Sequence, residues 1–121
     1  MSFTDLRTGT LNGIRLAWRD SGGGGAERAP ALVALHGHFS AGITFQRLAA
    51  TLSPEWRVVA PDQRGHGASG HPGDYSRDGY VGDAAALIDH LGLAPAVVLG
   101  HSLGGVNAYQ LAARRPELVR R

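Results

Sequence analysis

Short apolar runs alternate with amphipathic stretches along this chain. The runs, largely apolar and rich in β-branched residues, lie at residues 31–35, 57–60 and 96–99. Such runs are typical of strands buried on both faces of a parallel sheet. After each run, apolar side chains recur at helical spacing, over residues 41–52, 80–91 and 106–113. The alternation predicts parallel strands joined by right-handed crossover helices.

The first part of the chain has a different pattern. In residues 14–19, apolar side chains alternate with charged or small ones, which predicts a half-buried strand. Asn12 and Gly13 supply the positive φ angles that a two-residue hairpin turn requires. We therefore expect an antiparallel hairpin whose first strand lies within residues 3–11. A glycine-rich surface loop should follow at residues 21–25.

Local signals mark the ends of the later helices. Asp78 is a candidate N-cap for the helix over residues 80–91, and Gly92 is a candidate stop. The final helix should end near Arg115 and Pro116, because proline cannot continue a helix.

Composition limits the classes of partner. All twelve basic residues are arginine, the net charge is +2, and four arginines lie in the last eight residues. Cations near the end of a helix suit its dipole, so we interpret them as solvated rather than as a nucleic-acid patch. Cysteine is absent, and no apolar run approaches ~18 residues. We expect a cytoplasmic protein with no nucleic-acid or membrane partner.

One stretch has the form of a catalytic turn. Ser102 lies in Gly-x-Ser-x-Gly, between an apolar run and a segment with helical spacing. Such a nucleophile elbow holds the serine in a strained conformation. Gly100 and Gly104 avoid a collision with the crossing backbone. The start of the helix turns N–H groups toward a developing oxyanion, and the N–H of Leu103 is the nearest.

Two further signatures precede the elbow, each after a predicted strand. Residues 36–39 read His-Gly-His-Phe, and residues 62–69 read Asp-Gln-Arg-Gly-His-Gly-Ala-Ser. Together with Gly-His-Ser-Leu-Gly-Gly at residues 100–105, they resemble the α/β-hydrolase fold family, in particular its esterase-like and lactonase-like members. The resemblance covers nearly the whole chain. It implies an α/β fold, the N-terminal half of an α/β-hydrolase, with an antiparallel hairpin followed by parallel strands and crossover helices.

The resemblance assigns roles to single residues. Ser102 is then the nucleophile, and the backbone N–H groups of Leu103 and His38 form the oxyanion hole. Phe39 is the adjacent alternative to His38. The residues expected to brace the site structurally are His36, Gly37, Asp62, Gly100 and Gly104.

Two other interpretations of these motifs are weaker. Residues 65–70 match the Gly-x-Gly-x-x-Gly dinucleotide fingerprint, but His-Pro-Gly follows where a helix would have to begin. His36 and His38 are spaced like the start of a metal site, but the next residues add no ligand. We expect neither a cofactor nor a metal.

A serine nucleophile needs a base within reach and an acid that orients the base. In the resembled family both follow the elbow, and this sequence continues for only nineteen residues after the serine. We therefore expect one partial domain over residues 1–121, without the acid, the histidine and the lid. His36, His38 and His66 lie in loops at the same end of the sheet, and the His38 side chain is the candidate substitute base. His101 should point elsewhere.

The expected activity is hydrolysis of a carboxylic ester, lactone or thioester through an acyl-enzyme on Ser102, with a small-molecule acyl substrate. Serine at the elbow argues against the dehalogenase and epoxide hydrolase branches, which use a carboxylate nucleophile. The alternative is a catalytically inert fragment that acts as an assembly or binding partner. Without the later strands of the resembled fold, the strand over residues 96–99 would have an exposed apolar edge. We therefore expect that a complementary C-terminal fragment or a second copy of the chain covers it.

Overall fold

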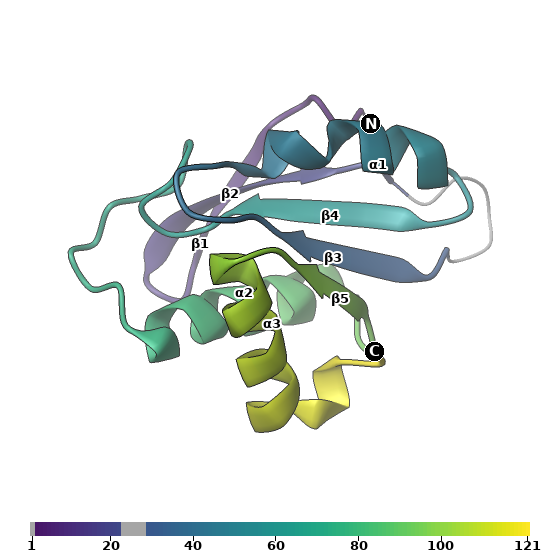
Figure 1. Ribbon diagram of the computed structural model, residues 1–121. Coiled ribbons are helices and arrows are strands. Elements are labelled where there is room, and N and C mark those ends of the chain that lie inside the picture. The colour runs from purple at the N-terminus through teal and green to yellow at the C-terminus, as the bar shows by residue number, and fades with distance from the viewer. Residues whose placement is uncertain (1, 23–28) are drawn as a thin grey trace.

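The computed structural model describes residues 2–22 and 29–121, which form a five-stranded sheet with helices on both faces (Figure 1). The strands are β1 (Arg7–Leu11), β2 (Ile14–Asp20), β3 (Ala31–Leu35), β4 (Arg57–Asp62) and β5 (Val97–Gly100). The α-helices are α1 (Gln46–Leu52), α2 (Arg77–Leu91) and α3 (Leu103–Arg114). Short 3-10 helices are η1 (Gly42–Phe45) and η2 (Pro116–Leu118).

The strand order is β1-β2-β4-β3-β5. β2 pairs antiparallel with both β1 and β4, whereas β3 pairs in parallel with both β4 and β5. The predicted hairpin followed by parallel strands is confirmed. Its turn has φ angles of 53° at Asn12 and 78° at Gly13, as the Asn-Gly pair predicts. Most of the predicted glycine-rich loop, at residues 23–25, lies outside the described residues.

The core has two layers, one on each face of the sheet. Val33 and Leu35 of β3 belong to the cluster that includes Leu87 of α2 and Leu111 of α3. The alternate β3 residues Leu32 and Ala34 belong to the cluster that includes Ala49 of α1. Because β3 is buried on both faces, its sequence is continuously apolar rather than alternating.

The ends of α2 agree with the sequence in part. Gly92 ends the helix in the left-handed conformation, with φ of 65°, as predicted. The N-cap prediction was wrong, because Ser76 rather than Asp78 caps the helix. The hydroxyl of Ser76 accepts a hydrogen bond from the N–H of Gly79 at 3.1 Å. Asp78 lies in the first turn, where its negative charge favours the helix dipole.

β5 lies at the edge of the sheet. Its outer side meets the last residues of the chain: the N–H of Ala96 donates to Leu118, the N–H of Arg120 donates to Ala96, and the N–H of Val98 donates to Arg121. Further along the strand, Leu99 is 41% exposed. Among the described residues, no helix is long and apolar enough to cross a membrane.

A polypeptide of residues 1–121 should self-associate through the end of β5 that the last residues leave uncovered, around the exposed Leu99, because an exposed apolar edge is a template for pairing. Sedimentation velocity would detect the associated species. Replacing Leu99 with Lys should shift the distribution toward monomer, since a charge blunts an edge. A wild-type polypeptide that sediments as a single monomer at all concentrations would contradict the prediction.

Candidate active site

Ser102 lies in the turn between β5 and α3, with φ of 55° and ψ of −115°. This is a sparsely populated conformation for a residue with a Cβ, and it costs on the order of 1–3 kcal/mol. The strained turn that the sequence predicts is therefore present. Ser102 is exposed and borders an open cleft of about 310 Å³.

The two glycines of the elbow make close backbone contacts. A Cβ on Gly104 would lie 2.0 Å from the carbonyl oxygen of Leu35, at the end of β3. A Cβ on Gly100 would lie 2.2 Å from the carbonyl oxygen of Gly104. No side chain fits in either place, so α3 can cross the end of β3 closely only with glycine at both positions.

The loop after β3 reaches the elbow. A Cβ on Gly37 would lie 3.4 Å from the Cβ of Ser102. The buried ring of His36 donates from Nδ1 to the carbonyl oxygen of Gly37 at 2.7 Å, and its Nε2 accepts from the N–H of Gln63 at 2.9 Å. These two bonds define a neutral imidazole with the proton on Nδ1.

The His36 hydrogen bond also orients the next peptide group. In a trans peptide the C=O and N–H point in opposite directions. Because the carbonyl of Gly37 faces the His36 ring, the N–H of His38 points away from that ring. Within residues 2–22 and 29–121, the backbone N–H groups of His38, Phe39 and Leu103 have no acceptor. Leu103 follows Ser102 in the chain and His38 borders the same cleft, so their two N–H groups are the candidate donors near the serine, whereas Phe39 borders the neighbouring cleft.

Asp62 braces the loops around the cleft. Its buried carboxylate accepts from the N–H of Gly42 at 2.7 Å and from the N–H of Ala68 at 2.9 Å. Ser69 extends the contact, since its hydroxyl donates to the carbonyl of Asp62 at 2.5 Å and accepts from the N–H of Ala17 at 2.9 Å. The loop after β4 is therefore tied both to the segment after β3 and to the hairpin.

The histidines differ in their availability as a base. His36 is buried and both of its ring nitrogens are engaged, so it has no lone pair for Ser102. His38 and His101 border the Ser102 cleft. His66 borders a neighbouring cleft, and its Nδ1 lies 3.0 Å from the carbonyl of Arg64.

The prediction that His101 points away was wrong, because its ring lies over Gly37, where a Cβ would come within 2.9 Å of the imidazole Nδ1. In the described part of the chain, no imidazole hydrogen-bonds to the hydroxyl of Ser102.

The dinucleotide interpretation does not fit the structure. Residues 65–70 close on themselves, with the N–H of Gly65 donating to Gly70 at 2.9 Å, and the next helix begins only at Arg77. No helix N-terminus follows this loop directly, whereas pyrophosphate binding requires one. The described residues contain no group of three or more side chains arranged to hold a metal ion.

The sequence did not identify a buried polar chain next to the site. The carboxamide of Gln63 donates to the carbonyl of His36 at 2.7 Å and accepts from Asn107 at 2.6 Å. Asn107 in turn accepts from Arg77. One signal in the sequence could have revealed this chain. Asn107 lies among apolar residues of the last helix, and a buried asparagine needs a polar partner.

The profile of the alpha/beta hydrolase fold family matches residues 30–121. The chain belongs to the α/β-hydrolase fold family. The sn-1-specific diacylglycerol lipase ABHD11 of Mus musculus is 42% identical over 94 residues, which cover 76% of this chain and 31% of the mouse protein. The 2-(acetamidomethylene)succinate hydrolase of Mesorhizobium japonicum is 39% identical over 108 residues, which cover 88% of this chain and 37% of that enzyme.

Solved structures in this family have the same architecture. The crystal structure of an epoxide hydrolase from Vigna radiata superposes with a TM-score of 0.87 and 31% identity, covering 96% of this chain and 37% of that one. This α/β-hydrolase chain thus spans about a third of the length of the relatives it matches. The three relatives named here are hydrolases that act on different substrates.

Gly104→Ala should destabilise the fold by about 1–3 kcal/mol, because the new methyl group would collide with the rigid carbonyl of Leu35. Gly105→Ala is a matched control on the same turn of α3. A Cβ there meets only the carbonyl of Gly100 at 3.4 Å, and alanine favours a helix. Urea denaturation would compare the two variants, and equal unfolding free energies would refute the close contact.

Stability should also depend on the protonation of His36. Burial lowers the pKa of His36 below its ordinary value of 6.5, although the hydrogen bond to Gly37 opposes the shift. The unfolded chain therefore binds a proton that the folded chain excludes as the pH falls below 6.5. The free energy of unfolding should decrease over this range until the folded pKa is reached, by at most about 1.4 kcal/mol per pH unit.

The check is denaturation at several pH values. In His36→Gln the free energy of unfolding should lose this contribution to its pH dependence. The control His71→Gln, at an exposed position, should keep it. If all three proteins change in parallel, another group causes the effect.

Proposed function

We propose that the chain is the nucleophile-bearing part of a serine hydrolase that acts on a carboxylic ester, lactone or thioester. The observation that carries this is the strained Ser102 at the mouth of a cleft. Within the described residues, the N–H of Leu103 next to it and the N–H of His38, which borders the same cleft, have no acceptor. A strained nucleophile and convergent donors are the arrangement that acyl transfer requires.

In the proposed reaction, Ser102 Oγ attacks the acyl carbonyl and its proton passes to a base. The negative charge that develops on the carbonyl oxygen is held by the N–H groups of Leu103 and His38. The alcohol or thiol then leaves with the proton, and water hydrolyses the acyl-enzyme. Each oxyanion donor of this kind contributes on the order of 3 kcal/mol to transition-state stabilisation.

In the whole enzyme the base and its acid partner are proposed to come from outside these 121 residues, and in the isolated polypeptide a histidine at the cleft is proposed to take the place of the base. His36 is fully engaged, and no imidazole is bonded to Ser102 in the described ranges. The side chains of His38 and His101 are the nearest substitutes, because both border the same cleft. No hydrogen bond or ion pair joins either imidazole to a carboxylate among the described residues, so neither is oriented as a triad histidine would be.

Serine rather than a carboxylate at the elbow favours an acyl substrate over an epoxide. The lipase name of the mouse relative supports the same class, whereas the plant relative is named for epoxides. We propose a small-molecule acyl substrate, with the lid and most of the acyl pocket supplied by further chain.

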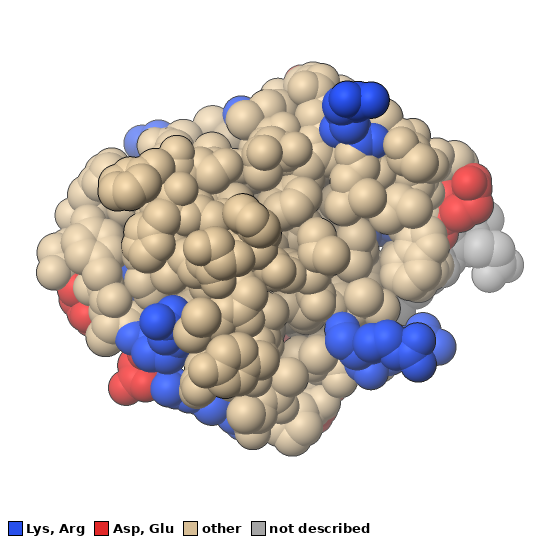
Figure 2. Space-filling view, in the orientation of Figure 1, with Lys and Arg blue, Asp and Glu red and all other residues tan. Residues whose placement is uncertain are grey.

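The competing function is that of an inert assembly partner. It is favoured by two observations: no base among the described residues is bonded to Ser102, and the face around β5 and α3 has an uncharged centre (Figure 2). Among the terminal arginines, Arg114 pairs with Asp78 at 2.5 Å and Arg115 with Glu117 at 2.6 Å. These pairs leave less free positive charge for a nucleic acid.

A fluorophosphonate probe distinguishes the two functions. The hydrolase proposal expects covalent labelling at Ser102, located by mass spectrometry, and p-nitrophenyl acetate turnover above that of Ser102→Ala. Labelling measures the nucleophile and the oxyanion hole directly, since the adduct carries a tetrahedral phosphoryl centre. Replacing His38 or His101 with Gln would then show which imidazole serves as a local base.

Equal labelling of the wild type and Ser102→Ala would sink the hydrolase proposal for this polypeptide. The inert-partner function would then stand. His71→Gln, an exposed histidine outside the cleft, serves as the control for nonspecific imidazole chemistry.

A further inference from the structure

A chain of side-chain hydrogen bonds runs beneath the proposed oxyanion hole. It begins at Arg77, the first residue of α2, passes through Asn107 of α3 and Gln63 after β4, and ends on the carbonyl of His36 after β3. Asn107, Gln63 and His36 are 0%, 5% and 0% exposed. Four segments of the fold therefore meet through one polar chain, which is buried from Asn107 to His36 and reaches the surface at the half-buried Arg77.

The direction of every bond in this chain is determined by its two ends. Arg77 has only donors, and the carbonyl of His36 can only accept. Asn107 must therefore turn its oxygen toward Arg77 and its NH₂ group toward Gln63. The carboxamide of Gln63 must turn its oxygen to Asn107 and its NH₂ group to His36. Neither amide can flip without placing two acceptors or two donors against each other.

Gln63 contacts the loop after β3 at two points. Its backbone N–H donates to His36 Nε2 at 2.9 Å, and its side chain donates to the His36 carbonyl at 2.7 Å. That carbonyl also lies against the start of α3, where a Cβ on Gly104 would come within 2.7 Å of it. The carbonyl thus sits between the two segments that carry the proposed donors.

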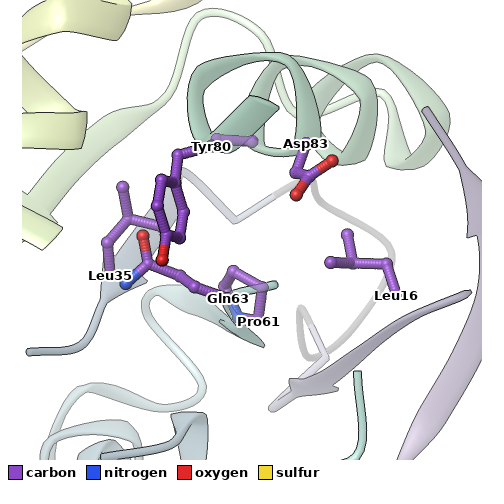
Figure 3. Close-up of a pocket in the computed structure, with 7 residues that line it drawn as sticks. Leu16, Leu35, Pro61, Gln63, Tyr80 and Asp83 are labelled. Carbon is purple, nitrogen blue, oxygen red and sulfur yellow. The ribbon is translucent and has the colours of Figure 1, made fainter. Parts of the chain in front are cut away.

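Two other polar side chains lie near Gln63, but neither takes over a hydrogen bond of the chain. With Tyr80 and Asp83 of α2, it lines a small cavity of about 10 Å³, whose remaining lining residues are apolar (Figure 3). Asp83 is engaged by Arg64, with a shortest contact of 2.6 Å, and by Asn12 at 3.0 Å. Among the described residues, Gln63 alone supplies a side-chain donor to the carbonyl of His36.

We propose that Gln63 is a positioning residue for the oxyanion hole, held by Asn107 and Arg77, which fixes the loop carrying the His38 N–H relative to the helix carrying the Leu103 N–H. The inference rests on the proposed function for its catalytic meaning. Small displacements matter here, because a shift of about 1 Å in a positioned group can reduce a rate about a hundredfold.

Gln63→Glu tests the direction of the hydrogen bonds. The ionised carboxylate can still accept from Asn107 but has no hydrogen for the carbonyl of His36, so two acceptors would face each other. Below the pKa of the new carboxyl group, its O–H can donate to that carbonyl and restore the chain. The rate of fluorophosphonate labelling at Ser102, relative to wild type at the same pH, should fall about tenfold or more at pH 7.5 and recover toward pH 5.

Two further variants make the test specific. Gln63→Met removes both side-chain bonds without adding a charge, so its defect should not recover at low pH. Gln110→Glu makes the same chemical change on α3, where the only side-chain partner of Gln110 in the described chain is the exposed Arg114. This control should match wild type across the pH range. A Gln63→Glu ratio that does not change with pH would overturn the inference.

Nuclear magnetic resonance separates this inference from the proposed function. In ¹⁵N-labelled protein, the amide resonance of His38 should move in Gln63→Glu at pH 7.5, return toward its wild-type position at pH 5, and stay unchanged in Gln110→Glu. This readout needs no reaction at Ser102. If the His38 resonance responds in this way but Ser102 is not labelled, positioning holds and the hydrolase proposal fails. If it is unaffected by both Gln63 variants, the positioning role is wrong.

Discussion

The close crossing of α3 over the end of β3 is the constraint on which the site depends. The carbonyl of Leu35 accepts from the N–H of His101 at 3.1 Å and lies where a Cβ on Gly104 would be. This contact brings the first turn of α3 beside the loop after β3. It determines how Ser102 and the start of α3 lie relative to the loop that carries His38, and therefore how the proposed nucleophile and the two proposed donors are placed at one cleft.

The sequence predicted the fold well because the signals for it are local. Apolar runs and the Asn-Gly turn depend on neighbours a few residues apart, and the elbow glycines at fixed spacing reveal the strained serine. It did not predict the contacts of Gln63, whose partners His36 and Asn107 are 27 and 44 residues away. Such pairing depends on how elements pack, which periodicity does not encode. The side-chain direction of His101 was missed for the same reason.

The histidines show how position divides one residue type between roles. His36 is neutral and buried, and it acts on the site through the peptide group it orients. His38 borders the cleft, is exposed, and carries the proposed backbone donor. The His-Gly-His motif at residues 36–38 therefore contains one buried structural histidine and one histidine at the surface of the cleft.

Three consecutive residues, the last of β4 and the two that follow it, hold three different parts of the molecule. Asp62 binds the N–H of Gly42 in η1, Gln63 binds the loop after β3 and α3, and Arg64 forms a buried ion pair with α2. Each side chain points in its own direction to its own partner, so the position of every residue in this segment is fixed separately. Insertion or deletion of a single residue here would move all three groups away from their partners at once. The length of this segment is therefore fixed by the fold, whereas the exposed residues 71–73 have room for an insertion.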